Sequence, residues 1–468
     1  MPNALCSSRK FFALKALYFP LYAAACLTLS SYSLSAQSPC INGLAAGYPC
    51  NEVDLMAHMS PSNIGGGEMS DIWGWTDPLD DSEYAIIGRE AGTSFIDITD
   101  PINPVYLGQL PTHTSNSIWR DIKVHNNYAY IVSEAGGHGM QVFDLTRLRN
   151  VSFPPETFTE DGHFSGFGSA HNLVINETTG HAFSVGGSTA SGGLHIIDLA
   201  NPTNPVTIGT FSEDGYTHDA QVVTYSGPDS QHIGKEIAFA CNENTVTIVD
   251  VSSPNDAVEL SSPGYSGSAY THQGWLTEDH RYFLSNDELD EYYFGGNTKT
   301  FIWDVQDLDA PTLLGTFTGT TSAIDHNLYT HQGRCYQSNY RAGLRILDLA
   351  DIANGNLEEV AYFDVYPTSN APAFNGTWSN YPYFASGNVI VSHIENGLYI
   401  LRPTLDPPPP PCPADLNGDG YMTVVDVLII LGDFGCSSGC EGDLDGDDMT
   451  TVVDVLTILG EFGSACPE

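Results

Sequence analysis

Four histidines that each stand beside a polar residue recur at intervals of about 50 residues. YTHDAQV spans residues 216–222, YTHQGWL spans residues 270–276, and HNL occurs at 171 and again at 326. Neutral imidazoles that converge from different segments are good ligands for zinc, copper or iron. A bound metal of this kind lowers the pKa of water enough to make a nucleophile near neutral pH. These positions indicate a candidate transition-metal site.

Carboxylates accompany the histidines, and Asp219, Glu288 or Glu134 is a candidate general base. Two other interpretations stay open: the histidines hydrogen-bond neighbouring units of the fold and satisfy buried backbone groups, or they catalyse without a metal. The sequence contains no HExxH metal motif, GxSxG nucleophile elbow or phosphate-binding glycine loop. The candidate catalytic residues are His171, His218, Asp219, His272, Glu288, Asp325 and His326.

The histidines belong to a repeat that runs through most of the chain. Runs of β-branched and aromatic residues each end in an aspartate and a turn, as in SFIDITDPINPVYLG. These aspartates are Asp97, Asp144, Asp198, Asp250, Asp304 and Asp348, and LYILRP at residues 398–403 is a seventh member without the acid. A second column precedes each by about 25 residues: SDI at 70, RDI at 120, HNL at 171, HDA at 218, HQG at 272, HNL at 326 and NGT at 375.

Each repeat contains short alternating runs separated by Gly, Pro, Asn and Asp, which predicts a small antiparallel sheet. Sheets that recur at this period close radially, so we predict an all-β, seven-bladed β-propeller over residues 37–402. The last repeat stops after LYILRP, and we expect NEVDLMAHM, residues 51–59, to supply its missing outer strand.

In a propeller, the start of the first strand and the end of the second lie at the same face of the disc. The four histidines should therefore surround one mouth of the central channel. The residues expected to share that face are Glu90, Glu134, His138, Glu243, Asp287, Glu288, Asn339, Arg341, His393 and Glu395. The aspartates that end the strand runs should accept hydrogen bonds within their turns. We expect packing between blades, rather than sugar stacking, for Trp73, Trp119, Trp275, Trp303 and Trp378.

Residues 40 to 403 closely resemble the LVIVD-repeat proteins called choice-of-anchor B. The resemblance rests on long motifs, which are GMQVFDLTRLR, YTHDAQ, YTHQGWLTEDHRYFLSNDELDE, DHNLY and NYRAGLR. It implies a secreted β-propeller module that different organisms couple to different C-terminal attachment devices. It brings no established activity.

A proline-rich linker, residues 403–411, leads into a second domain at residues 412–468. DLNGDGYMTVVD matches a twelve-residue calcium loop, and DLDGDDMTTVVD repeats it with Asp448 in place of the glycine at position 6. Each loop runs into an apolar helix, VVDVLIILGDFG or VVDVLTILGEFG. The predicted calcium ligands are Asp415, Asn417, Asp419, Tyr421, Thr423 and Asp426 in the first loop, and Asp443, Asp445, Asp447, Met449, Thr451 and Asp454 in the second.

This second domain resembles a type I dockerin, particularly the cysteine-flanked variety at the C-terminus of bacterial surface proteins. The resemblance covers both loops and both helices, and it implies two calcium ions and docking to a cohesin-like or cell-surface partner. Val424, Val425, Val452 and Val453 stand where cellulosomal dockerins usually carry polar recognition residues.

The N-terminus carries three cations, the apolar run FFALKALYFPLYAAACLTL and the small residues SLSAQ. This pattern predicts a signal peptide over residues 1–36 and an exported protein; lipidation at Cys26 is a weaker alternative. No later run has the roughly 20 apolar residues of a membrane span. A net charge of −42 makes nucleic acid and anionic membrane surfaces poor partners.

Ten cysteines are present, of which Cys6 and Cys26 fall in the leader. Exported disulfides are plausible between Cys40 and Cys50 and within the C-terminal domain. The spacing there permits Cys412 with Cys436 and Cys440 with Cys466, although three pairings exist. Cys241 and Cys335 fall in non-adjacent repeats, so we expect two buried thiols.

Two functional hypotheses fit these features. The first is a calcium-stabilised, exported binding protein that is displayed on a cell surface or extracellular complex through its dockerin-like domain. The second is a metal-dependent extracellular hydrolase, acting on a polysaccharide or an ester, with its site at the propeller mouth and a targeting tail.

Overall fold

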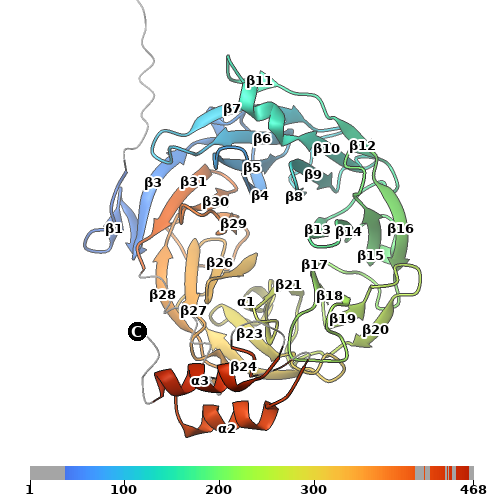
Figure 1. Cartoon of the computed structure of the whole chain (residues 1–468). Helices are drawn as coiled ribbons and strands as arrows, with labels where there is room; N and C mark the ends of the chain where they lie inside the picture. Colours follow the sequence, from blue (N-terminus) through green and yellow to red (C-terminus); the bar gives the residue numbers. More distant parts are fainter. Residues whose placement is uncertain are drawn as a thin grey trace, which may run out of the picture. The chain divides into compact units, whose positions relative to one another are not determined.

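The computed structural model describes residues 37–405, 416, 422–437, 440, 442–444 and 449–462. Seven antiparallel sheets lie around a central channel, as Figure 1 shows, so the predicted seven-bladed propeller is confirmed. The predicted signal peptide lies outside the described residues, as does the linker from residue 406 onward. Among the described residues, we find no helix with the length and apolar character that a membrane span requires.

The blades follow one another along the chain, and their strands run outward from the channel. The first three blades contain β4 (Met69–Thr76), β5 (Glu83–Arg89), β6 (Gly92–Asp97) and β7 (Val105–Pro111); β8 (Arg120–His125), β9 (Tyr128–Ser133), β10 (Met140–Asp144) and β12 (Gly162–Phe164); and β13 (Asn172–Asn176), β14 (His181–Val185), β15 (Leu194–Asp198) and β16 (Val206–Phe211). The short strand β11 (Glu156–Thr157) pairs in parallel with β7.

The remaining blades repeat this arrangement. They contain β17 (Asp219–Thr224), β18 (Glu236–Cys241), β19 (Val246–Asp250) and β20 (Val258–Ser261); β21 (Thr271–Leu276), β22 (Tyr282–Asp287), β23 (Lys299–Asp304) and β24 (Thr312–Thr318); β25 (Leu328–His331), β26 (Arg334–Ser338), β27 (Leu344–Asp348) and β28 (Glu358–Phe363); and β29 (Thr377–Tyr381), β30 (Val389–His393) and β31 (Gly397–Pro403). The connections carry α1 (Asp290–Phe294) and the 3-10 turns Pro61–Asn63, Leu145–Asn150, Ala190–Gly192 and Ile352–Asn354.

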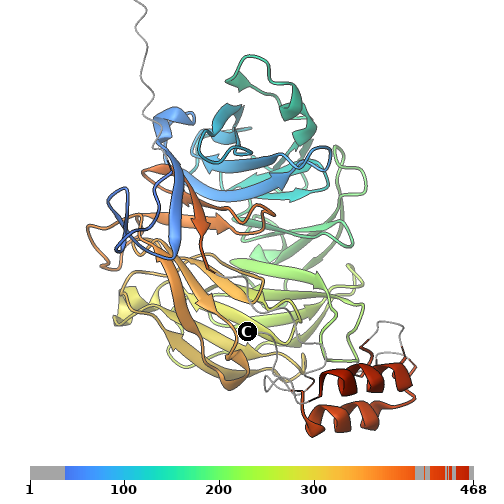
Figure 2. The same ribbon diagram turned by 60° about the vertical axis from the view of Figure 1, so that its left-hand side comes forward.

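The N-terminal segment closes the ring. Strand β3 (Val53–Met59) pairs antiparallel with β31, and Figures 1 and 2 both show the two strands side by side. This confirms that residues 51–59 supply the missing outer strand of the last blade. Strands β1 (Leu44–Ala45) and β2 (Tyr48–Asn51) extend the preceding blade beyond β28, and the Cys40–Cys50 disulfide holds them.

Apolar side chains fill the space between neighbouring blades. Tyr130 and Val132 of the second blade, for example, share one buried cluster with Leu173 and Ala182 of the third. The aspartates that end the third strands cap the turns, as predicted, because each accepts the backbone N–H of the residue two positions later. These aspartates are Asp97, Asp144, Asp198, Asp250, Asp304 and Asp348.

Two local predictions for the propeller are wrong. The seventh member of the second column is Trp378 with Ser379, not the Asn375 motif, because the backbone oxygen of Trp378 accepts from His326 as that of His272 accepts from His218. Trp119 does not pack between blades, since 47% of its surface is exposed.

Cys241 and Cys335 are buried thiols, as expected.

The described part of the C-terminal domain contains α2 (Val424–Asp433) and α3 (Val452–Glu461). Each helix begins with a capping box, formed by Thr423 with Asp426 and by Thr451 with Asp454. Met422, Ile430 and Ile458 form a small core between them. The structure describes six of the predicted calcium ligands, which are the capping-box residues Thr423, Asp426, Thr451 and Asp454 together with Asp443 and Met449. The other six lie outside the described residues; they are Asp415, Asn417, Asp419, Tyr421, Asp445 and Asp447.

The cysteine pairing suggested for this domain is wrong. Cys436 pairs with Cys440, four residues later, which excludes both Cys412 with Cys436 and Cys440 with Cys466. The turn after α2 brings the two sulfur atoms together, a local arrangement that spacing alone does not indicate. Cys412 and Cys466 lie outside the described residues.

Candidate functional site

The four column histidines lie next to one another at one end of the channel. The ring centroids are 4.3 Å apart for His171 and His218, 4.3 Å for His218 and His272, and 4.4 Å for His272 and His326. Each enters from a different blade, at the start of β13, β17, β21 or β25. The repeated blade thus places the same side chain at the same height around the channel.

Hydrogen bonds orient these imidazoles. The Nδ1 atoms of His218 and His326 lie within hydrogen-bonding distance of the backbone oxygens of His272 and Trp378, each in the next blade. Since a carbonyl oxygen only accepts, both Nδ1 atoms must carry the proton, and each Nε2 keeps its lone pair. His171 instead pairs through Nδ1 with Glu134, at 2.6 Å. The histidines therefore fasten blades together and still present ligand atoms.

Burial keeps three of the imidazoles neutral. It lowers the pKa of His218 and of His272 well below the ordinary value, and neighbouring histidines lower both further. Burial also lowers the pKa of His326 to about 3. Neutral imidazole is the form that binds metals.

One carboxylate joins the histidines. Glu288, at the end of β22, accepts a 2.8 Å hydrogen bond from the Tyr340 hydroxyl, and its Oε1 lies 3.8 Å from Nε2 of His326. Burial raises the pKa of Glu288 to about 7. His272, Glu288 and His326 each offer a ligand atom, and these three atoms lie within 4.8 Å of one another. This arrangement is a candidate metal centre with two nitrogen ligands and one oxygen ligand.

The other two candidate carboxylates lie elsewhere. Asp325 is buried, lines no part of the cavity at the channel mouth, and has its pKa raised well above the ordinary value by burial and by the adjacent Glu291 and Asp290. Asp219 lies deeper in the channel, where it accepts the backbone N–H of Ala220. Burial raises the pKa of Asp219 to about 7, although Lys123 acts in the opposite direction. Neither residue joins the cluster of possible metal ligands.

A cavity of about 480 Å³ opens beside the histidines. Its polar lining includes His171, His218, His326, Glu288 and Glu395. Its walls include Trp119, Tyr340, Phe374 and Trp378, of which Trp119 and Phe374 are 47% and 45% exposed. These aromatic residues were not predicted as site residues, although Trp119 directly precedes the column member Arg120 in the sequence. The volume lies in the range of small-molecule sites.

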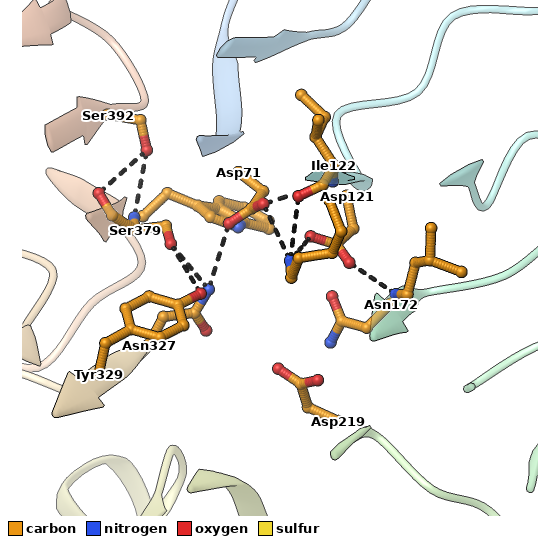
Figure 3. A network of polar contacts seen from close by, with 12 residues as sticks. Asp71, Asp121, Ile122, Asn172, Asp219, Asn327, Tyr329, Ser379 and Ser392 are labelled. Atoms are coloured by element: carbon orange, nitrogen blue, oxygen red, sulfur yellow. Dashed lines mark hydrogen bonds and ion pairs between the residues drawn. The ribbon is translucent and has the colours of Figure 1, made fainter. Parts of the chain in front are cut away.

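A second polar network, also not predicted, joins side chains of several blades around the channel (Figure 3). Lys123 Nζ lies 2.6 Å from Asp121 and 3.5 Å from Asp71, and it stands 4.6 Å from the ring centre of Trp73. The carboxylates of Asp71, Asp121 and Asp219 point toward one space in the channel. Asp71 and Asp121 also accept backbone N–H groups from the next blade, so this layer joins blades.

Two solved structures resemble the chain over much of its length. The hydrazine synthase of Kuenenia stuttgartiensis has a TM-score of 0.49 and 13% sequence identity, and the match covers 69% of this chain and 93% of that one. The computationally designed protein Ika8 has a TM-score of 0.45 and 10% identity, and the match covers 72% of this chain and 83% of that one. No curated protein matches the sequence.

A family comparison identifies the repeat. The family model called LVIVD repeat matches residues 119–138, which include β9 of the second blade, and residues 189–213, which include β15 and β16 of the third. Two segments of the chain therefore match the LVIVD repeat, and the seven sheets around the channel form a β-propeller.

Proposed function

We propose that this chain is an exported binding protein whose propeller takes a ligand in the cavity at the channel mouth. The observation that carries the proposal is the cavity itself, where aromatic walls adjoin carboxylate and imidazole groups that hydrogen bonds hold in place. Concave sites with a few fixed polar groups are the usual form of small-ligand sites. The C-terminal domain displays the propeller on a cell surface or an extracellular complex.

The cavity chemistry favours a neutral polysaccharide as the ligand. The exposed rings of Trp119 and Phe374 suit stacking against sugar faces, and Glu288 and Glu395 accept hydrogen bonds from hydroxyl groups. A net charge of −42 disfavours polyanionic ligands.

The surface of the C-terminal helices supports an anchoring role. Ten large apolar side chains on α2 and α3 have exposed fractions between 45% and 62%, far more than a small domain exposes without a partner. They occupy equivalent positions on the two helices and are Val424, Val425, Leu428, Leu431, Phe434, Val452, Val453, Leu456, Leu459 and Phe462. We propose that this apolar face, with two calcium ions bound in the loops, docks on a cohesin-like or cell-surface protein.

Affinity electrophoresis of the full chain through gels that contain a soluble neutral polysaccharide, such as a glucan, xylan or mannan, tests the ligand proposal. The unmodified protein should be retarded by at least one of these polymers. Trp119→Ala should lower the affinity for that polymer at least about fivefold, because truncating an aromatic anchor residue commonly costs about 1 kcal/mol or more of binding free energy. Phe153→Ala is the matched control, because Phe153 is 88% exposed and does not line the cavity. Equal retardation of both variants would place binding elsewhere.

The convergence of two imidazoles and a carboxylate beside an open cavity favours a second candidate function. This candidate is a metal-dependent hydrolase that cleaves a polysaccharide or an ester with a metal-activated water. Its test is release of reducing sugar or of nitrophenol from aryl esters by the full chain with added Zn²⁺. Loss of activity in Glu288→Gln would support it, and equal activity in that variant would refute it.

A further inference from the structure

We infer that His272, Glu288 and His326 form a binding site for a divalent transition metal ion, of the zinc or ferrous class, at the channel mouth. This inference goes beyond the proposed binding function, because an ion can bind here whether or not the cavity takes a polysaccharide. It rests on distances, on the hydrogen bonds that orient two of the ligands, and on a buried histidine whose ring nitrogens lack hydrogen bonds of ordinary geometry.

The distances suit one ion. The three ligand atoms lie within 4.8 Å of one another, and Nε2 of His326 and Oε1 of Glu288 are separated by 3.8 Å. Two ligands of a tetrahedral zinc ion stand roughly 3.4 Å apart. Small side-chain shifts therefore bring these atoms into coordination without a change in the backbone.

Two of the ligands are already held by second partners. The backbone oxygen of Trp378 fixes the proton of His326 on Nδ1, which leaves the Nε2 lone pair facing Glu288. The Tyr340 hydroxyl donates to Oε1 of Glu288 and orients this carboxylate. Backbone carbonyls and hydroxyls in these positions are the usual outer partners of metal-binding histidine and carboxylate groups.

His272 supplies the independent observation. It is 1% exposed, and neither of its buried ring nitrogens makes a hydrogen bond of ordinary geometry, which holds for no other histidine among the described residues. Asn286 is the polar side chain beside it; because its amide also accepts from the backbone N–H of Gln273 and donates to the backbone oxygen of His326, its contact with the imidazole satisfies at most one ring nitrogen. Leaving a buried polar group unsatisfied costs about 1–3 kcal/mol. A metal ion on one ring nitrogen removes this penalty.

The surroundings admit a cation and leave room for a further ligand. Arg120 lies near the histidines, but its guanidinium group is turned to the backbone oxygen of Arg89 and to the His138 and Thr112 side chains. A void of about 10 Å³, the size of one water molecule, lies among the four histidines. Glu288 and His326 also face the 480 Å³ cavity. Three protein ligands with an open position are typical of catalytic metal sites rather than structural ones.

Titration of the full chain with Co²⁺, a visible-absorbing substitute for Zn²⁺, tests the inference. Saturating Ca²⁺ is kept present so that the C-terminal loops are occupied. The unmodified protein should develop a ligand-field absorption band that saturates at one equivalent of Co²⁺. Glu288→Gln retains an acceptor for Tyr340 but loses the charge, and His272→Gln loses a ligand without losing the hydrogen bonds that orient the other two ligands. Each should weaken Co²⁺ binding at least about tenfold.

Glu68→Gln is the matched control, because Glu68 lines the same cavity and is not one of the three ligands. It should bind Co²⁺ as the unmodified protein does. Absence of a band in the unmodified protein, or equal affinity in Glu288→Gln, would overturn the metal site, provided near-ultraviolet circular dichroism shows the variant folded. Trp119→Ala separates the two proposals, since it should lose polysaccharide retardation and keep the Co²⁺ band.

Discussion

Replacing Lys123 with methionine should destabilise the propeller strongly, and more at high pH than at low pH. Lys123 lies buried between Asp121 and Asp71, at 2.6 and 3.5 Å. Removing one partner of a buried ion pair typically costs about 3–5 kcal/mol, because the remaining charge stays buried without compensation. For a domain of this size, 4 kcal/mol corresponds to a decrease of about 5 °C in Tm.

The pH dependence follows from the carboxylates. Burial opposes ionisation of Asp121, but the charge of Lys123 together with hydrogen bonds from Asp71, Lys123 and the backbone N–H of Leu173 holds the pKa of Asp121 below the ordinary value. Asp121 therefore stabilises the unmodified protein above its unfolded pKa of about 3.9, and this contribution is lost as the pH falls. Without Lys123, burial raises the pKa of Asp121, so the variant loses stability as the pH rises. The difference between the two proteins should be larger at pH 8 than at pH 5.

Guanidinium unfolding followed by tryptophan fluorescence measures this difference. All six tryptophans lie before residue 403, so the signal reports on the propeller in the full chain. Lys235→Met is the control, because Lys235 pairs with Asp250 at 3.0 Å with 39% of its side chain exposed. Exposed pairs contribute about 0–1 kcal/mol. Equal destabilisation by the two substitutions, or a Lys123→Met effect that does not change between pH 5 and 8, would refute the reasoning.

Three further predictions concern other parts of the molecule. Burial raises the pKa of Asp219 to about 7 from an ordinary 3.8, so stability should decrease between about pH 4 and pH 7, by on the order of 4 kcal/mol in full, as the unfolded chain ionises and the folded protein does not. Urea unfolding of Asp219→Asn should lack this decrease. Burial raises the thiol pKa of Cys241 and Cys335, so iodoacetamide should modify neither residue in the native protein and both after unfolding, as read by mass spectrometry. Calorimetry of the EGTA-treated chain should show two calcium sites of unequal affinity, because the second loop lacks the position-6 glycine. Asp426→Ala should remove the tighter site and Asp454→Ala the weaker one. A single site, or equal affinities, would contradict this.

The propeller was predictable because each repeat carries its own signals. The strand runs, the turn-capping aspartates and the missing outer strand at residues 51–59 all follow from local patterns, and the structure confirms them. The positions of the four histidines follow for the same reason, since a constant offset within a blade becomes a constant height in the channel.

Features that depend on one blade alone were not predictable. The seventh column member is Trp378 and not Asn375, since the backbone oxygen of Trp378 accepts from His326 of the preceding blade, and nothing in the Asn-Gly-Thr motif signals this. Lys123 occurs in a single blade, and its partner Asp71 is 52 residues away, so no repeated pattern joins them. The Cys436–Cys440 disulfide depends on the path of one turn.

The role of the channel mouth is tested most directly by anomalous diffraction from crystals of the full chain grown with Zn²⁺ and without chelator, with data collected on both sides of the zinc absorption edge. An anomalous peak within coordination distance of His272, Glu288 and His326 is the predicted result. Clear electron density for these side chains with no anomalous peak between them would contradict a metal centre and leave the histidines as contacts between blades.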